Sequence, residues 1–115
     1  MKREVIKAIM KNIDAERILK LTEEIEVRKG EIASKTLVQN QALNITLFAF
    51  DADEEISTHA SHGDAFVQVL EGTGKFTIDS KDYELSGGDS IVMPAGKPHA
   101  IKSLTPFKWL LTVVY

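Results

Sequence analysis

From Glu31 to the end, the chain is a series of short segments rich in β-branched and aromatic residues, with no helical pattern between them. Clusters of glycine, proline, asparagine, aspartate and serine separate the segments. Parallel strands would need crossover segments of roughly a dozen residues, and the chain has none. The pattern therefore predicts an all-β fold of antiparallel strands, either a barrel or a double sheet. The clearest segments are 34–39, 44–50, 65–70, 74–78, 90–93 and 107–114.

Residues 1–30 follow a different pattern. Between residues 5 and 25 the apolar side chains recur at a spacing nearer 3.6 than 2. Asp14 is placed to cap a short helix over 15–21, because its carboxylate can accept the free amides of a first turn. We therefore expect an N-terminal extension over 1–30, helical or irregular, that lies across one sheet. A barrel domain over 31–115 follows it.

Two of the expected strands, 45–50 and 107–114, are apolar on both faces. A strand with one face in water alternates apolar and polar residues, so the second face of these strands needs a cover. The N-terminal extension can supply part of it. A second copy of the chain is expected to supply the rest, because large exposed apolar patches usually mark interfaces. The sequence therefore predicts a homodimer.

Composition narrows the classes of partner and compartment. The chain has 14 Lys and Arg against 17 Asp and Glu, a net charge of −3, and these charges are interspersed. No basic face stands out for nucleic acid. The N-terminus lacks the apolar run of a signal peptide, and no stretch has the length of a membrane span. We expect a cytoplasmic protein without nucleic-acid or membrane partners.

All three histidines lie in two short segments, His59 and His62 in the first and His99 in the second. Imidazole is the commonest protein metal ligand and the side chain that titrates nearest neutral pH. The chain contains no cysteine, so no thiolate competes for such a role. His59, His62 and His99 are therefore the candidate ligands for a divalent metal.

The segment around His99 resembles the second motif of the cupin family, G-x5-P-x-G-x2-H-x3-N. The matches are Gly88, Pro94, Gly96 and His99, and Ser103 stands where the family has Asn. The resemblance implies a small single-domain cupin, with a jelly-roll β-barrel over about residues 37–115.

The first cupin motif, G-x5-H-x-H-x3-E-x6-G, matches less well. Anchored on Gly72, it matches again only at His59. Ser61 and Ala65 stand where the family has its second His and its Glu, and Asp53 stands at the opening Gly. The resemblance implies that His59 and His99 face each other inside the barrel, where the family binds metal through His, His, Glu and His.

Two residues near these gaps are potential replacements for the missing ligands. His62 lies one residue past the expected second His, and a bulge in its turn would direct it inward. Asp64 lies next to the missing Glu and would need the same local shift. As alternatives to ligation, His62 is a solvated turn residue and Asp64 a turn residue beside Gly63.

Two functions remain open at this point. The resemblance implies a metal-dependent enzyme of the dioxygenase or isomerase type, with Fe, Mn, Ni or Zn as the divalent metal. The other function is metal-free binding of a small molecule in the barrel, with His59 and His99 as neutral hydrogen-bonding groups. Ala65, Val67 and Val69 are expected to line the barrel on the His59 side, which indicates a small and mostly apolar pocket.

Overall fold

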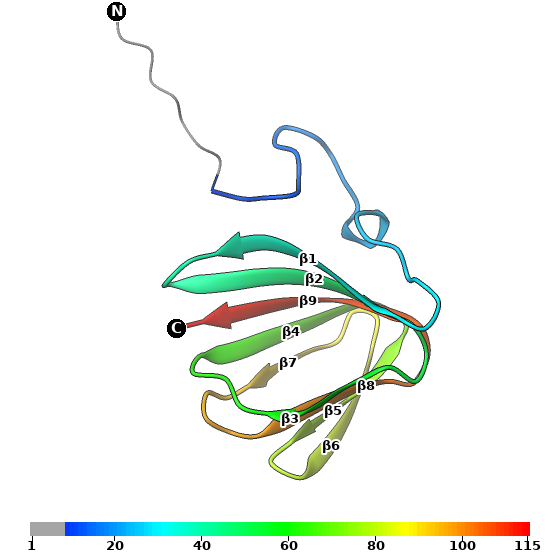
Figure 1. Cartoon of the computed structure of the whole chain (residues 1–115), viewed down its shortest axis with the longest axis vertical. Coiled ribbons are helices and arrows are strands. Elements are labelled where there is room, and N and C mark those ends of the chain that lie inside the picture. Colours follow the sequence, from blue (N-terminus) through cyan, green and yellow to red (C-terminus); the bar gives the residue numbers. More distant parts are fainter. Residues whose placement is uncertain (1–8) are drawn as a thin grey trace, which may run out of the picture.

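The computed structural model describes residues 9–115, which form two antiparallel sheets that face each other (Figure 1). The larger sheet has the strand order β1-β2-β9-β4-β7 and the smaller one the order β3-β8-β5-β6. The expected all-β fold is confirmed, since the described residues contain a single turn of helix. The elements are the 3-10 helix η1 (Leu21–Glu23) and the strands β1 (Ile32–Gln39), β2 (Leu43–Phe50), β3 (Glu55–His59), β4 (Asp64–Glu71), β5 (Thr73–Ile78), β6 (Lys81–Ser86), β7 (Ser90–Met93), β8 (His99–Ser103) and β9 (Phe107–Val114).

The space between the two sheets is filled by an aromatic cluster around Trp109. Its indole ring stacks on Phe48 with ring centroids 4.7 Å apart, and it meets Phe76 edge to face at 5.4 Å. Phe50 and Phe107 complete the cluster, and both are fully buried. Aromatic rings bury large apolar areas in these geometries, so this cluster is the main stabilising contact between the sheets.

The outer face of the larger sheet is covered in part by the segment that precedes β1. Leu47 and Ala49 point outward from β2, yet both are fully buried because Ile25 packs on them. We call residues 20–28 the N-terminal strap. Lys108 fastens it, since its Nζ donates a hydrogen bond of 2.6 Å to the carbonyl of Thr22.

The residues ahead of the strap are irregular rather than helical, and the expected helix over 15–21 is wrong. Glu16 has a φ of 58°, a left-handed conformation that interrupts a right-handed helix. Asp14 caps no helix, and its carboxylate instead lies 3.4 Å from Arg17. The first eight residues of the expected N-terminal extension lie outside the described part of the chain.

The strap gives a direct stability test. Ile25 is 9% exposed, so we expect Ile25→Ala to lower the free energy of unfolding by about 2 kcal/mol, from lost burial and the cavity left behind. Urea denaturation followed by Trp109 fluorescence measures this change. Ile18→Ala is the matched control, because Ile18 is fully exposed and its loss should change stability by less than about 0.5 kcal/mol. Equal effects of the two variants would contradict the packing role of the strap.

Candidate functional site

The pairing of β3 with β8 brings two of the three histidines together. His59 ends β3 and His99 begins β8, and the two are direct partners in the antiparallel register. Their Nε2 atoms are 3.1 Å apart, with the ring planes inclined at 71°. The structure therefore places His59 opposite His99, as the resemblance implied.

Two loops hold this pair in position. Gly96 has a φ of 78°, which a side chain would disfavour, and its N–H donates a hydrogen bond of 2.8 Å to the carbonyl of Ser61. The Ala95 N–H donates to the Asp64 carboxylate at 2.8 Å. These bonds join the loop before His99 to the loop after His59. The proline and glycine of the second motif thus form a tight turn ahead of His99.

Hydrogen bonds define the protons on the two imidazoles. Nδ1 of His59 lies 2.9 Å from the carbonyl oxygen of Ser57, which can only accept, so this nitrogen carries the proton. Nε2 of His59 then holds a lone pair and accepts a hydrogen bond from Nε2–H of His99. As a consequence, Nδ1 of His99 is unprotonated, buried and without a hydrogen-bond partner.

The environment favours the neutral form of His99. Burial lowers the pKa of the His99 imidazole below its usual value, and repulsion from His59 lowers it further. The Lys97 backbone acts in the opposite direction and is the weakest of the three influences. A neutral imidazole is the form that can hydrogen-bond a neutral ligand or bind a metal.

The histidine pair lies in the wall of a cavity of about 370 Å³ between the sheets. The cavity wall is mostly apolar, and its polar side chains besides Trp109 are His59, Ser61, His62, His99 and Tyr115. Its volume falls in the usual range for small-molecule sites. The apolar lining residues are Phe48, Ile56, Ala60, Ala65, Met93, Ile101, Leu111 and Val113.

The remaining sequence candidates have different positions. His62 contributes to the cavity wall but is itself exposed. Asp64 is not part of the wall and its carboxylate is used by Ala95, so it does not replace the missing Glu. Ser61 and Ala65, which stand at the two absent ligand positions, both line the cavity. Val67 and Val69 are buried in the core behind it.

Two nitrogen atoms bound to one ion at about 2.1 Å lie about 3.0 to 3.4 Å apart when the angle between them is near 90° to 109°. The 3.1 Å between the Nε2 atoms of His59 and His99 fits this geometry. Within residues 9–115, no three or more His, Asp or Glu side chains gather as a metal-binding group. The pair thus fits two ligands of a divalent ion, and a third protein ligand is not in place.

Ser103, at the departure from the second motif, has a structural role. It is fully buried, and its hydroxyl bonds to the carbonyl of Asp51 while accepting a 2.9 Å hydrogen bond from the N–H of Glu54. These bonds hold the turn between β2 and β3. Ser103 therefore supports the strand that carries His59, without reaching the cavity.

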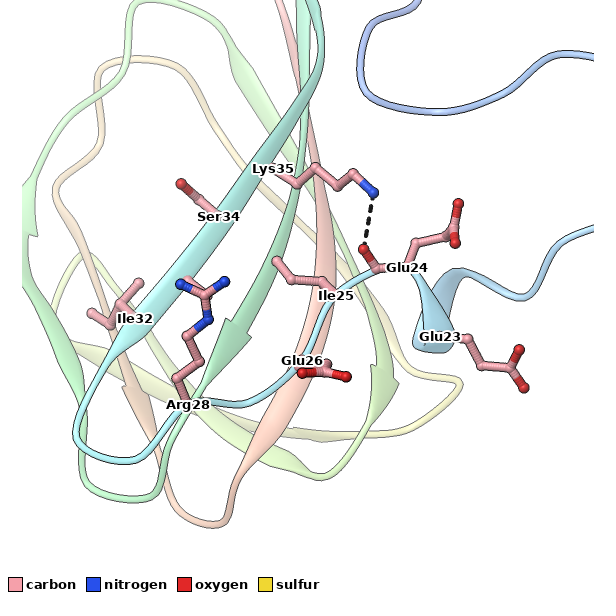
Figure 2. A pocket seen from close by; sticks show the side chains of 9 residues that line it. Glu23, Glu24, Ile25, Glu26, Arg28, Ile32, Ser34 and Lys35 are labelled. Carbon is pink, nitrogen blue, oxygen red and sulfur yellow. Dashed lines mark hydrogen bonds between the residues drawn. The ribbon is translucent and has the colours of Figure 1, made fainter.

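A larger groove of about 740 Å³ lies elsewhere, between the strap and β1 (Figure 2). Lys35 crosses it, with its Nζ donating a 3.0 Å hydrogen bond to the carbonyl of Glu24. Glu23, Glu26 and Arg28 along its rim are exposed. The groove is shallow, polar and without histidine, so the smaller barrel cavity is the better candidate site.

Sequence reasoning missed two cavity residues. Trp109 was expected only as part of a strand, and Tyr115 was not singled out, yet both line the cavity. The alternation of Phe107, Trp109, Leu111 and Val113 along β9 was the available signal for Trp109.

Comparison with known proteins identifies the family to which this fold belongs. A cupin domain model matches residues 46–114. A crystal structure of a protein of unknown function from Streptococcus pyogenes is 42% identical, with a TM-score of 0.92, covering 94% of this chain and 95% of that one. A cupin superfamily protein from Desulfitobacterium hafniense is 34% identical, with a TM-score of 0.88, covering 93% of this chain and 98% of that one. The chain belongs to the cupin family.

More distant similarity adds only the fold. A salicylate 1,2-dioxygenase from Pseudoaminobacter salicylatoxidans is 22% identical, with a TM-score of 0.67, covering 72% of this chain and 26% of that one. No curated protein matches the chain. Among the described residues, no helix is long and apolar enough to cross a membrane.

The lowered pKa of His99 predicts a pH-dependent stability. Above about pH 6.5, the usual His value, the ring is neutral in both states and stability is highest. Below it the unfolded chain takes up the proton first, so the free energy of unfolding should fall as the pH falls. Urea titrations between about pH 5 and 8 measure this slope. It should flatten in His99→Gln and persist in His62→Gln, which removes an exposed imidazole. An unchanged slope in His99→Gln would contradict the assignment.

Proposed function

We propose that this cupin binds a small organic molecule in the barrel cavity, with an apolar body and one oxygen-bearing end at the His59–His99 pair. The observation that carries this proposal is the cavity of about 370 Å³ whose apolar wall holds two imidazoles with converging Nε2 atoms. Apolar cavities with a few convergent polar groups are the usual form of small-molecule sites.

The positions of the protons on His59 and His99 indicate which chemical group the ligand presents to them. His99 holds an Nε2–H donor and His59 an Nε2 lone pair; these bond to each other at 3.1 Å, so a ligand that uses both must insert between them. A hydroxyl group can accept from the first and donate to the second, so an alcohol or a phenol matches both. Charged groups are a poorer match, because a carboxylate meets a lone pair at His59 and an ammonium meets an N–H at His99.

Trp109 makes this proposal directly testable, because it is the only tryptophan and lines the cavity. Titration with n-hexanol should give a saturable change in its fluorescence. His59→Ala and His99→Ala should each weaken binding about tenfold, the effect of roughly one hydrogen bond. Ala65→Phe should abolish it by filling the cavity. A fluorescence change that does not saturate, or that persists in Ala65→Phe, would overturn the proposal.

A metal-dependent enzyme of the dioxygenase or isomerase type is the second candidate. Its support is the 3.1 Å separation of the two Nε2 atoms, which suits two nitrogen ligands of one Fe, Mn, Ni or Zn ion. When bound, such an ion supplies Lewis acidity or activates a water molecule. His59 and His99 would hold it, with His62 as the third histidine available in the cavity wall.

Elemental analysis of protein without a polyhistidine tag, incubated with each of the four ions, tests the metal candidate. His59→Ala and His99→Ala should each abolish stoichiometric binding, since either change leaves one converging imidazole. His62→Ala should retain it, because this side chain is exposed and not grouped with the pair. Loss of metal in His62→Ala would mean that His62 turns inward to ligate. A wild-type protein without stoichiometric metal would end the metal candidate.

We also propose that the protein is a homodimer. Beyond the strap, Phe66, Val92 and Val114 remain 39%, 51% and 52% exposed on the larger sheet, and Phe66 and Val92 are direct strand partners. Contiguous exposed apolar side chains on a sheet favour association. A second copy of the chain presents the same surface, as a two-fold interface requires.

Sedimentation at micromolar concentration should give twice the chain mass. Phe66→Glu should shift the protein to monomer by placing an unpaired charge in the interface. Tyr83→Glu is the matched control, because Tyr83 has a similar exposure of 38% but lies on the smaller sheet. A monomeric wild-type protein would contradict the proposal.

A further inference from the structure

A second space of about 540 Å³, shallow and largely open to solvent, lies beside the barrel cavity. Four carboxamide side chains line it together with one imidazole and one phenol, and no Asp, Glu, Lys or Arg does. These residues are Gln39, Asn40, Gln41, Asn44, His62 and Tyr115. We call this space the outer cavity.

The outer cavity and the barrel cavity are neighbours that share two walls. His62 and Tyr115 line both. These two side chains therefore lie between the two spaces, and a ligand that reaches from the His59–His99 pair to the outer cavity must pass them. The other end of a sufficiently long ligand arrives among the carboxamides.

One of these carboxamides has an unsatisfied atom. Oδ1 of Asn44 is buried without a hydrogen-bond partner, whereas Nδ2 of Asn44 donates a bond of 2.7 Å to the hydroxyl of Tyr115. If the amide were turned over, the tyrosine would meet Oδ1 and the amide nitrogen would lack a partner instead. In either orientation one polar atom of the Asn44 amide lacks a hydrogen-bond partner, and an unpaired buried polar group lowers the stability of a fold.

The other carboxamides differ from Asn44. Oδ1 of Asn40 accepts the N–H groups of Ala42 and Leu43, so it is used by the turn between β1 and β2. Gln39 and Gln41 are exposed to solvent. Tyr115 is 55% exposed, and its bond to Asn44 is the one hydrogen bond its side chain makes within the described residues. Displacement of the tyrosine ring therefore opens Asn44 at the cost of one exposed hydrogen bond.

We infer that the two cavities form one binding site for an elongated neutral ligand, with a hydroxyl at the His59–His99 pair and a hydroxyl or amide group at Asn44. A carboxamide donates and accepts, which matches either group. The absence of ionised side chains from the outer cavity disfavours a charged end. This inference rests on the proposed small-molecule function and adds the second recognition point, so it names a class of bifunctional ligand.

The experiment compares straight-chain α,ω-diols of roughly five to eight carbons with the n-alkanols of equal length, using Trp109 fluorescence and calorimetry. The diol adds one hydroxyl to the same apolar body. At the length that spans both cavities, the diol should bind about fivefold to tenfold more tightly than its alkanol, as one added hydrogen bond allows. Shorter diols should show no such gain.

Substitutions test whether Asn44 causes the tighter binding of the diol. Asn44→Leu, similar in size, should abolish the diol advantage and leave alkanol binding unchanged. Tyr115→Phe should keep or increase the advantage, because it frees the amide from its internal partner. Gln41→Leu is the matched control, an exposed carboxamide of the same cavity, and should keep the advantage. Thermal melting identifies any variant that fails to fold. If Asn44→Leu fails to fold, the diol advantage in the wild-type protein and in Tyr115→Phe tests the role of Asn44 instead.

The outcomes separate this inference from the proposed function. If alkanols bind but no diol binds more tightly, or if the advantage survives in Asn44→Leu, the outer recognition point is wrong and the barrel site stands. If neither alkanols nor diols of any length bind, the proposed function fails and this inference fails with it.

Discussion

Burial of β2 on both faces is the constraint on which the other parts of this fold depend. On the inner face, Phe50 and Trp109 are fully buried in the aromatic cluster. On the outer face, Leu47 and Ala49 are equally buried, because the strap packs on them through Ile25. A single barrel has one interior, so the outer face needs added structure. The strap supplies part of that cover, and the apolar patch at Phe66 and Val92 marks the part that a second copy is proposed to fill.

Strand pairing within the smaller sheet brings the histidines together. His59 and His99 meet because β3 and β8 pair, with a bulge between Ile56 and His59 that adjusts the register. Ser61 and Ala65 occupy the positions where the family motif has its other two ligands, and both line the cavity. Small side chains at these two positions leave room where larger ligands would stand. The departures from the motif thus remove metal ligands and enlarge the space for an organic ligand in one step.

The sequence was a good guide where local pattern and long-range packing agree. Segments rich in β-branched and aromatic residues predicted the strands, and the resemblance to the second cupin motif predicted that His99 faces His59. The expected helix after Asp14 failed because Ile18, in the middle of its apolar pattern, stays fully exposed, and helix propensity alone is weak over so few residues. The hydrogen bond between Asn44 and Tyr115 joins residues 71 positions apart, so no local sequence pattern predicts it.

One proton on His99 decides between the two candidate functions. With that proton on Nε2, the pair donates one hydrogen bond and accepts one, which suits a neutral hydroxyl. For two imidazoles to bind one ion, both Nε2 atoms must present lone pairs, so the proton of His99 must move to Nδ1. In the structure Nδ1 of His99 makes no hydrogen bond, and the Lys97 backbone is the group near this ring that favours its protonation. The metal-binding tautomer of a histidine is normally fixed by a hydrogen-bond acceptor at the ring nitrogen that does not bind the metal. A metal ion and a neutral hydroxyl would therefore compete for the same two nitrogen atoms, each with a different tautomer of His99.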